Sequence, residues 1–397
     1  MALKKSIMNL HLSPLTKLTL LLLSMMTMMS NVAIVTMLPH LKDHFEDVAN
    51  IEFFSRLMIT LPSLSIALLA PFLGHLVDKI NKKRSAILAL LIFAVAGSGG
   101  LYLHTIEELL ASRALFGVAV AILMIVTTSL VGDYFEGESR HTFMGLQSAF
   151  ISIGGIVFII GGGLLSDISW RYPFAIYLIA LLILPFVLRY IVEVEQHPTH
   201  QVGNTNEQAN LKGIYLLAFI LMLLFYILPT QMPFLMINEF GASGTLTGAI
   251  IATAFVSNAL GAMSFAKLKK HLSFAQIYLL GLTIIGVGFI LIGLVNNIYL
   301  FFLTSPIMGF GGGVMMTNIS AWMLHKAHHK KRVKSSGYLT SSLFMGQFFS
   351  PIVFHPIVLA FGVHQFFVVV GVSVLTLTLL AFLNFQRGSG TRSTPLS

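Results

Sequence analysis

Runs of apolar residues, each about 20 residues long, recur along nearly the whole of this sequence of 397 residues. A helix needs roughly 20 apolar residues to cross the hydrocarbon core of a bilayer, so each run predicts one membrane-spanning helix. Only short connections remain between the runs, which excludes a separate soluble domain. The twelve runs fall at residues 18–38, 54–76, 85–104, 110–131, 143–165, 172–191, 213–236, 246–266, 275–295, 298–322, 337–360 and 363–385.

The composition agrees with a chain that lies mostly in lipid. Hydrophobic residues make up 56% of it and charged residues 10%, whereas soluble domains carry about 25% charged residues. The net charge of +9 does not point to nucleic acid, because the basic residues lie in small groups between apolar runs. The first run is too long for a signal peptide and lacks a small-residue cleavage site. No cysteine is present, which excludes disulfides and thiolate metal sites.

Lysine and arginine placement predicts which helix ends face the cytoplasm, since short cytoplasmic loops carry an excess of both. With the N-terminus inside, 20 of the 24 lysines and arginines fall on the inner side. Only Lys42, Arg56 and Arg171 fall on the outer side, and Arg113 lies within the fourth run. A miscounted span would scramble this bias, so the sequence predicts that both termini are cytoplasmic.

A polar segment divides the runs into six and six. It predicts an N-terminal six-helix bundle over residues 1–192, a cytoplasmic linker over 193–211 and a C-terminal six-helix bundle over 212–397. Parallel repeats of six helices are typical of transporters, because they create a binding site near the bilayer midplane.

Glycines occupy matching positions in the two halves. Gly145 and Gly154 in the fifth run are nine residues apart, as are Gly337 and Gly346 in the eleventh. In the same frame, the fourth run carries Arg113 and Gly117 where the tenth carries Ser305 and Gly309. Several matches in one order favour an internal repeat over chance.

The loop after the second run carries a longer motif, Gly74-His-Leu-Val-Asp78-Lys-Ile-Asn-Lys-Lys-Arg84. A weaker copy over residues 261–270 has Phe265 in place of the aspartate. Together with twelve predicted helices in two halves, this resembles the major facilitator superfamily over nearly the whole chain. The resemblance implies an all-α membrane protein, with 12 transmembrane helices arranged as two pseudo-symmetric six-helix bundles.

Further matches resemble the drug:proton antiporter branch of that superfamily. The segment from Arg113 to Gly117 is similar to its fourth-helix motif, and the glycine spacing of the fifth run is similar to its antiporter motif. Trp170-Arg171-Tyr172 resembles the usual entry to the sixth helix. Two positions depart from the pattern: Phe158-Ile159 stands where a Gly-Pro pair is expected, and Ser30 where some relatives have an aspartate.

The resemblance implies residues that close and open the transporter. By family analogy, Asp78 accepts hydrogen bonds at the start of the eleventh helix and closes the cytoplasmic side, where a carboxylate is favoured by the helix dipole. The alternative for the neighbouring basic cluster is that it only sets topology. The predicted conformational-gate residues are Gly74, Asp78, Lys79, Lys82, Lys83, Arg84, Gly154, Gly162, Gly163 and Pro351.

Charged groups inside spans are informative because each is costly in lipid. Arg113 is interpreted as a cavity arginine that binds an anionic group or tunes a proton site, with snorkelling to the interface as the alternative. None of the 15 acidic residues lies near the centre of a span. The proton-coupling group is therefore an acid near a helix end or a histidine such as His355, whose ordinary pKa is near 6.5, unless transport is uncoupled. His355 as an interfacial hydrogen-bonding residue is the alternative.

Uncharged polar residues within spans are expected to face the bundle interior. They either line the substrate path or bond helix to helix. The predicted substrate-site or proton-site residues are Arg113, His355, Asn31, Tyr226, Gln231, Asn258, Asn318 and Gln347. His328 and His329 lie in a basic loop and are expected to be solvated, and no metal site is predicted.

The repeat predicts a secondary transporter that works by alternating access, and the resemblance to the antiporter branch implies that it exports an amphipathic drug or small metabolite in exchange for protons. Uptake of a small organic solute, by proton symport or facilitated diffusion, is the alternative. No enzyme motif and no phosphate-binding loop occurs in the sequence. We expect no cofactor, a monomer with a small-molecule substrate and protons as its ligands, and a place in the bacterial cytoplasmic (inner) membrane.

Overall fold

The computed structural model describes residues 13–76, 81–135, 137–193, 211–327 and 332–390. The chain divides into two compact units, unit 1 over Met1–Thr205 and unit 2 over Asn206–Ser397. Most of the predicted linker lies outside the described residues, as do Asp78, Lys79, His328 and His329.

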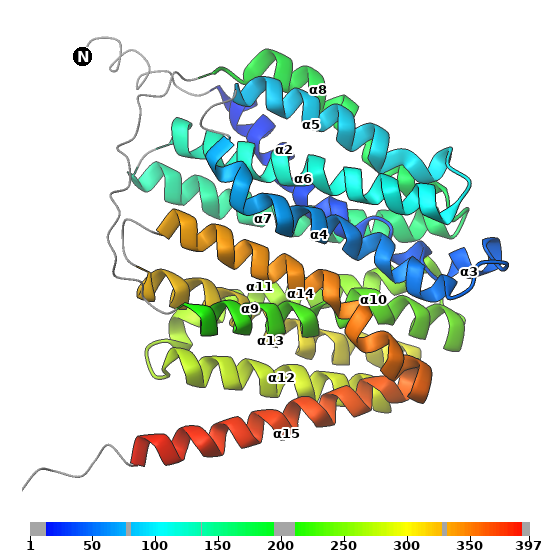
Figure 1. Cartoon of the computed structure of the whole chain (residues 1–397), viewed down its shortest axis with the longest axis vertical. Helices are drawn as coiled ribbons and strands as arrows, with labels where there is room; N and C mark the ends of the chain where they lie inside the picture. Colours follow the sequence, from blue (N-terminus) through cyan, green and yellow to red (C-terminus); the bar gives the residue numbers. More distant parts are fainter. Residues whose placement is uncertain (1–12, 77–80, 136, 194–210, 328–331, 391–397) are drawn as a thin grey trace, which may run out of the picture. The chain divides into compact units, whose positions relative to one another are not determined.

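Unit 1 is built of helices that run side by side (Figure 1). Polar caps set where several of them begin: the Asn81 side chain accepts a hydrogen bond from the backbone amide of Arg84 at 2.8 Å, and Thr105 and Glu108 form a capping box. The first helix ends at Val32 and continues as a 3₁₀ segment, Val35–Met37. The helices are α2 (Pro14–Val32), α4 (Ile51–Leu76), α5 (Lys82–Gly97), α6 (Ile106–Tyr134), α7 (Gly137–Ser166) and α8 (Ile179–Tyr190), with the short α3 (His40–His44) after α2.

Unit 2 repeats this arrangement, except that its first span is broken. Pro229 cannot donate a hydrogen bond to the carbonyl of Phe225, and α9 ends at that residue. A π-helical segment, Leu235–Glu239, completes the span. The helices are α9 (Lys212–Phe225), α10 (Ile227–Phe234), α11 (Gly244–Leu268), α12 (Phe274–Leu294), α13 (Phe301–Lys326), α14 (Arg332–Phe361) and α15 (Val363–Gly390).

Eleven segments of the described chain are long and apolar enough to cross a membrane. They coincide with the second to twelfth predicted runs. The described apolar part of α2, Pro14–Thr27, is shorter, but α2 as a whole has 19 residues and so rises roughly 28 Å, close to the thickness of the hydrocarbon core. The chain is an all-α, multi-pass membrane protein, and no strand occurs in the described residues.

The same pairs of helices pack together in both units. In unit 1, α4 packs on α6, α5 on α6 and α8, and α2 on α7 and α6. In unit 2, α11 packs on α13, α12 on α13 and α15, and α9 on α14 and α13. Each pair in one unit has its counterpart in the other, so the repeat predicted from glycine spacing is a repeat of packing.

The matched glycines lie where these helices approach most closely. A Cβ atom on Gly117 would lie 2.5 Å from the Pro62 carbonyl oxygen, and one on Gly309 would lie 2.1 Å from that of Ala254. Gly154 and Gly346 likewise face the partner helix closely, with the nearest atoms at 2.2 and 2.3 Å. Helices in a bilayer associate through such close contact at small residues, because lipid offers no hydrophobic drive for association.

Gly161 and Gly162 are neighbours on α7, and replacing each by alanine distinguishes the cost of overpacking from the effect of alanine on helix propensity. A Cβ on Gly162 would lie 2.1 Å from the Ala33 carbonyl oxygen, whereas one on Gly161 would meet nothing within 4 Å. Gly162→Ala should therefore destabilise unit 1 by about 1–3 kcal/mol, the usual cost of overpacking. Gly161→Ala should leave the thermal unfolding midpoint in detergent unchanged or slightly raised. Equal midpoints for the two variants would contradict the close contact.

Candidate functional site

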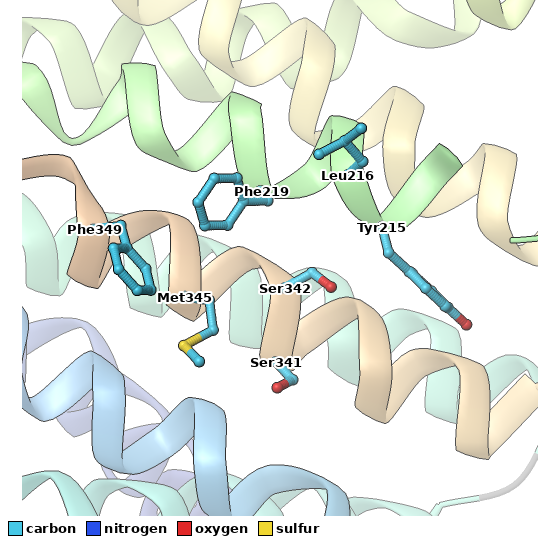
Figure 2. Close-up of a pocket in the computed structure, with 7 residues that line it drawn as sticks. All are labelled: Tyr215, Leu216, Phe219, Ser341, Ser342, Met345 and Phe349. Carbon is cyan, nitrogen blue, oxygen red and sulfur yellow. The ribbon is translucent and has the colours of Figure 1, made fainter. Parts of the chain in front are cut away.

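A groove of about 330 Å³ lies between α9 and α14 of unit 2 (Figure 2). Three lining residues come from α9 and four from α14. They are Tyr215, Leu216, Phe219, Ser341, Ser342, Met345 and Phe349. Residues four positions apart lie on the same face of a helix. Residues 215 and 219 therefore share one face of α9, and residues 341, 345 and 349 share one face of α14.

Gly346 sets the distance between the two helices beside the groove. A Cβ at this position would lie 2.3 Å from the Phe219 carbonyl oxygen and 3.0 Å from the backbone nitrogen of Leu223. The two helices touch at this point, and the larger lining side chains lie around it. The groove is therefore a consequence of glycine at the contact and bulky residues around it.

The groove has aromatic walls and three hydroxyl groups, those of Tyr215, Ser341 and Ser342, and none of its seven lining residues is charged. The rings of Phe219 and Phe349 lie 6.1 Å apart at 56°. The Ser342 hydroxyl donates to the Tyr338 carbonyl at 2.9 Å, so its own oxygen is available as an acceptor. Such walls suit a flat, largely apolar molecule with few polar groups, and Met345 adds an adaptable surface.

Arg113 lies in the interior of unit 1, with its side chain fully buried. Its Nη2 atom donates to the carbonyl oxygens of Ala96, at 2.7 Å, and Gly97, at the end of α5. The guanidinium also lies over the rings of Phe116, 4.7 Å from the ring centroid, and Tyr177 at 5.1 Å. A cation at a helix C-terminus satisfies free carbonyls and complements the dipole. In these contacts Arg113 joins α6 to α5 and to the 3₁₀ segment Tyr172–Leu178 that precedes α8.

Lys82 makes a close ion pair at the start of α5. Its Nζ atom lies 2.5 Å from Oδ2 of Asp133 near the end of α6, and the two side chains are 3% and 15% exposed. The carboxylate of Glu193 accepts hydrogen bonds from the backbone amides of Lys82, at 2.8 Å, and Lys83, at 3.0 Å. Lys83 in turn donates to the Leu188 carbonyl at 2.7 Å. This cluster ties α5, α6 and the end of α8 together.

Six of the eight residues predicted for the substrate or proton site belong to unit 2, five of them on α10, α11, α13 and α14 and Tyr226 between α9 and α10. Asn318 donates to the Phe274 carbonyl at 3.0 Å, and Gln347 lies 3.6 Å from the sulfur of Met222. Asn258, on α11, lies close to Gly312 on α13. Tyr226 follows α9, Gln231 is buried in α10 and His355 is on α14. None of these residues lines the groove.

The other predicted residues are placed by their helices. Gly74 lies in the last turn of α4, Gly163 is buried in α7 and Pro351 is buried in α14. Arg84, in the first turn of α5, is exposed. Asn31 is in α2, but its side chain is outside the described part of the chain.

Sequence reasoning did not single out the seven groove residues, nor the partners Asp133 and Glu193. A signal for the groove exists in the four-residue spacing of Tyr215 with Phe219 and of Met345 with Phe349. It is weak, because aromatic and methionine side chains at helical spacing also fill ordinary cores. Asp133 is 51 residues from Lys82, and nothing in the sequence between them indicates a pair.

Replacing Lys82 tests the ion pair. Removing one partner of a buried pair costs about 3–5 kcal/mol, and because Asp133 is partly exposed we expect Lys82→Met to fall at the lower end. Replacing both partners, in Lys82→Met with Asp133→Leu, should recover most of the loss, since no charge is left unpaired. Thermal unfolding in detergent measures both, with the exposed Arg84→Met as a control that should change little. A double variant no more stable than Lys82→Met would argue against the pair.

Comparison with known proteins gives matches along nearly the whole chain. The model of the Major Facilitator Superfamily matches residues 20–213 and again 214–397. The sequence is 32% identical over 172 residues to Multidrug resistance protein 2 of Bacillus subtilis (strain 168), covering 40% of this chain and 42% of that protein. It is 28% identical over 164 residues to Quinolone resistance protein NorA of Staphylococcus aureus (strain Mu50), covering 41% of each. The match thus spans less than half the length of either relative.

Solved structures of similar fold cover nearly the whole chain. A bacterial homologue of the human lysosomal transporter Spinster superposes with a TM-score of 0.73 at 17% identity, covering 94% of this chain and 98% of that one. The nucleoside transporter NupG superposes with a TM-score of 0.76 at 14% identity, covering 93% and 99%. At these identities the likeness concerns the fold alone.

Proposed function

Because this chain belongs to the Major Facilitator Superfamily, we propose that it exports amphipathic, mainly aromatic small molecules by alternating access, in exchange for protons. In this proposal it is a monomer of the bacterial cytoplasmic membrane with both termini inside. The likeness to two drug-resistance proteins supports export, although it extends over less than half of each of them.

The observation that carries the proposal is the uncharged aromatic groove between α9 and α14. A sugar or amino acid carrier needs several fixed hydrogen-bond or charged groups to hold its substrate. The groove instead offers three aromatic rings, a methionine and two serine hydroxyls, which favours planar amphipathic molecules. The groove is our candidate for part of the substrate path.

Proton exchange requires a group that titrates between the two sides of the membrane. His355 remains our candidate, because it is on α14, the helix that supplies four of the seven groove residues. A histidine can bind and release a proton near neutral pH, as coupling to a physiological gradient requires. The Lys82–Asp133 pair is our candidate for part of the cytoplasmic gate, together with the loop that contains Asp78.

Flux measurements decide between export by antiport and the alternative of uptake. In liposomes containing the purified protein and an imposed pH gradient, a fluorescent quinolone should accumulate on the side from which protons leave. Protein-free liposomes and liposomes treated with a protonophore should show no accumulation. Movement of the quinolone in the same direction as protons would replace antiport with symport, and flux indifferent to the gradient would indicate facilitated diffusion.

Single substitutions test the groove. Phe219→Ala and Phe349→Ala should each weaken equilibrium binding of the quinolone to the purified protein by about 2- to 10-fold, since an aromatic contact contributes about 0.5–1.5 kcal/mol. Phe382→Ala is the matched control, because Phe382 is an exposed phenylalanine on α15 far along the chain from the groove. Binding that is unchanged in both groove variants would exclude this groove from the substrate path.

A further inference from the structure

The sequence beyond Glu239 is basic and contains no acidic residue. Beyond Glu239 the sequence contains ten lysines and arginines and not one aspartate or glutamate. Unit 1 differs, because its Lys82 pairs with Asp133 and the start of its α5 is held by Glu193. Glu239 itself is near His364, with Nδ1 and Oε2 3.7 Å apart. The lysines that follow α11 and α13 therefore have no carboxylate in the sequence after Glu239 to pair with.

Two of these lysines lie over aromatic rings that also contact each other. Lys269, just after α11, has its Nζ atom 4.4 Å from the ring centroid of Phe274, and Lys326, at the end of α13, has its Nζ atom 5.8 Å from that of Trp322. Phe274 and Trp322 are stacked, with centroids 5.8 Å apart and planes within 7° of parallel. The ring of His325 lies 5.4 Å from Phe274. These five residues form one continuous surface, the aromatic-basic patch.

The donors of this patch are accessible. Lys326 and His325 are exposed, as are the neighbouring Lys267, Lys270 and His271. The ammonium group of Lys269 donates one hydrogen bond, to the Leu272 carbonyl at 3.3 Å, and an ammonium group has three donors. Several N–H donors thus remain for an external acceptor carrying negative charge.

We propose that the aromatic-basic patch binds the headgroup of an anionic phospholipid. Stacked aromatic side chains are favoured at the level of the headgroups, and juxtamembrane lysines are attracted to anionic lipid. The lipid phosphate accepts hydrogen bonds from Lys269, Lys270 and Lys326, and the glycerol backbone lies against Phe274 and Trp322. The rule that cytoplasmic loops are basic accounts for the side on which the lysines lie. It does not require the stacked rings of Phe274 and Trp322 beside them, nor the absence of acidic residues after Glu239.

The two tryptophans of the chain make the test specific, since Trp322 is in the patch and Trp170 is in unit 1. In the Trp170→Phe variant, Trp322 is the sole tryptophan, and brominated lipids that reach it quench its fluorescence. In phosphatidylcholine bilayers, brominated phosphatidylglycerol should show a relative binding constant at least about fivefold that of brominated phosphatidylcholine, the effect expected for one lysine near an anionic surface.

The preference should disappear when Lys269→Gln, Lys270→Gln and Lys326→Gln are combined in this background. Removing two exposed arginines of unit 1, in Arg84→Gln with Arg189→Gln, should leave it unchanged. The Trp322→Phe variant, which reports from Trp170, should show no preference. The readout is binding, so it stands independently of whether the protein exports quinolones.

Equal quenching of Trp322 by the two lipids would overturn the proposal, as would a preference that survives the triple lysine variant. Excess glycerol phosphate in the buffer separates a lipid site from a site for soluble phosphate. A preference that persists in its presence supports the lipid, and one that is abolished by it assigns the patch to a water-soluble anion instead.

Discussion

Backbone contact at glycine holds each six-helix unit together, and the position of the groove follows from it. Helices that associate within lipid gain no hydrophobic stabilisation, so the attraction between them comes from van der Waals contact at close approach. Gly162, Gly309 and Gly346 each bring a partner helix so near that a Cβ atom would lie within 2.3 Å of a backbone oxygen. At Gly346 this contact also decides how far apart the walls of the groove between α9 and α14 lie.

Charge is distributed differently in two halves that pack alike. Buried charges need partners, because water is not available to solvate them. In unit 1 the partners are internal: Arg113 donates to the carbonyls that end α5, and Lys82 pairs with Asp133. In the described part of unit 2, Lys267, Lys270 and Lys326 are exposed, and Lys269 and Lys326 lie over aromatic rings. The units are therefore equivalent in packing but not in how their charged side chains are paired.

Much of the fold was predictable because lipid imposes simple rules on sequence. Span length predicted the helices, and the glycine frame predicted that Gly117 corresponds to Gly309 and Gly154 to Gly346, which are contact points in the structure. The site was less predictable. Tyr215 and Phe219 resemble any apolar residues of a buried helix, since a groove is a property of two facing helices. The place of Arg113 within a span was visible in the sequence, but its carbonyl partners 16 and 17 residues away were not.

The sequence by itself determined that this chain is a membrane protein of twelve helices in two related halves, with its basic residues grouped between the apolar runs. Those properties depend on local composition and spacing, because the length and hydrophobicity of a segment decide whether it crosses a bilayer. Only the tertiary structure decided which side chains meet: Lys82 with Asp133, Trp322 with Phe274, and α9 with α14 around an uncharged groove. The physical reason is that these contacts join residues from different helices, and their geometry is set by packing that no single stretch of sequence encodes.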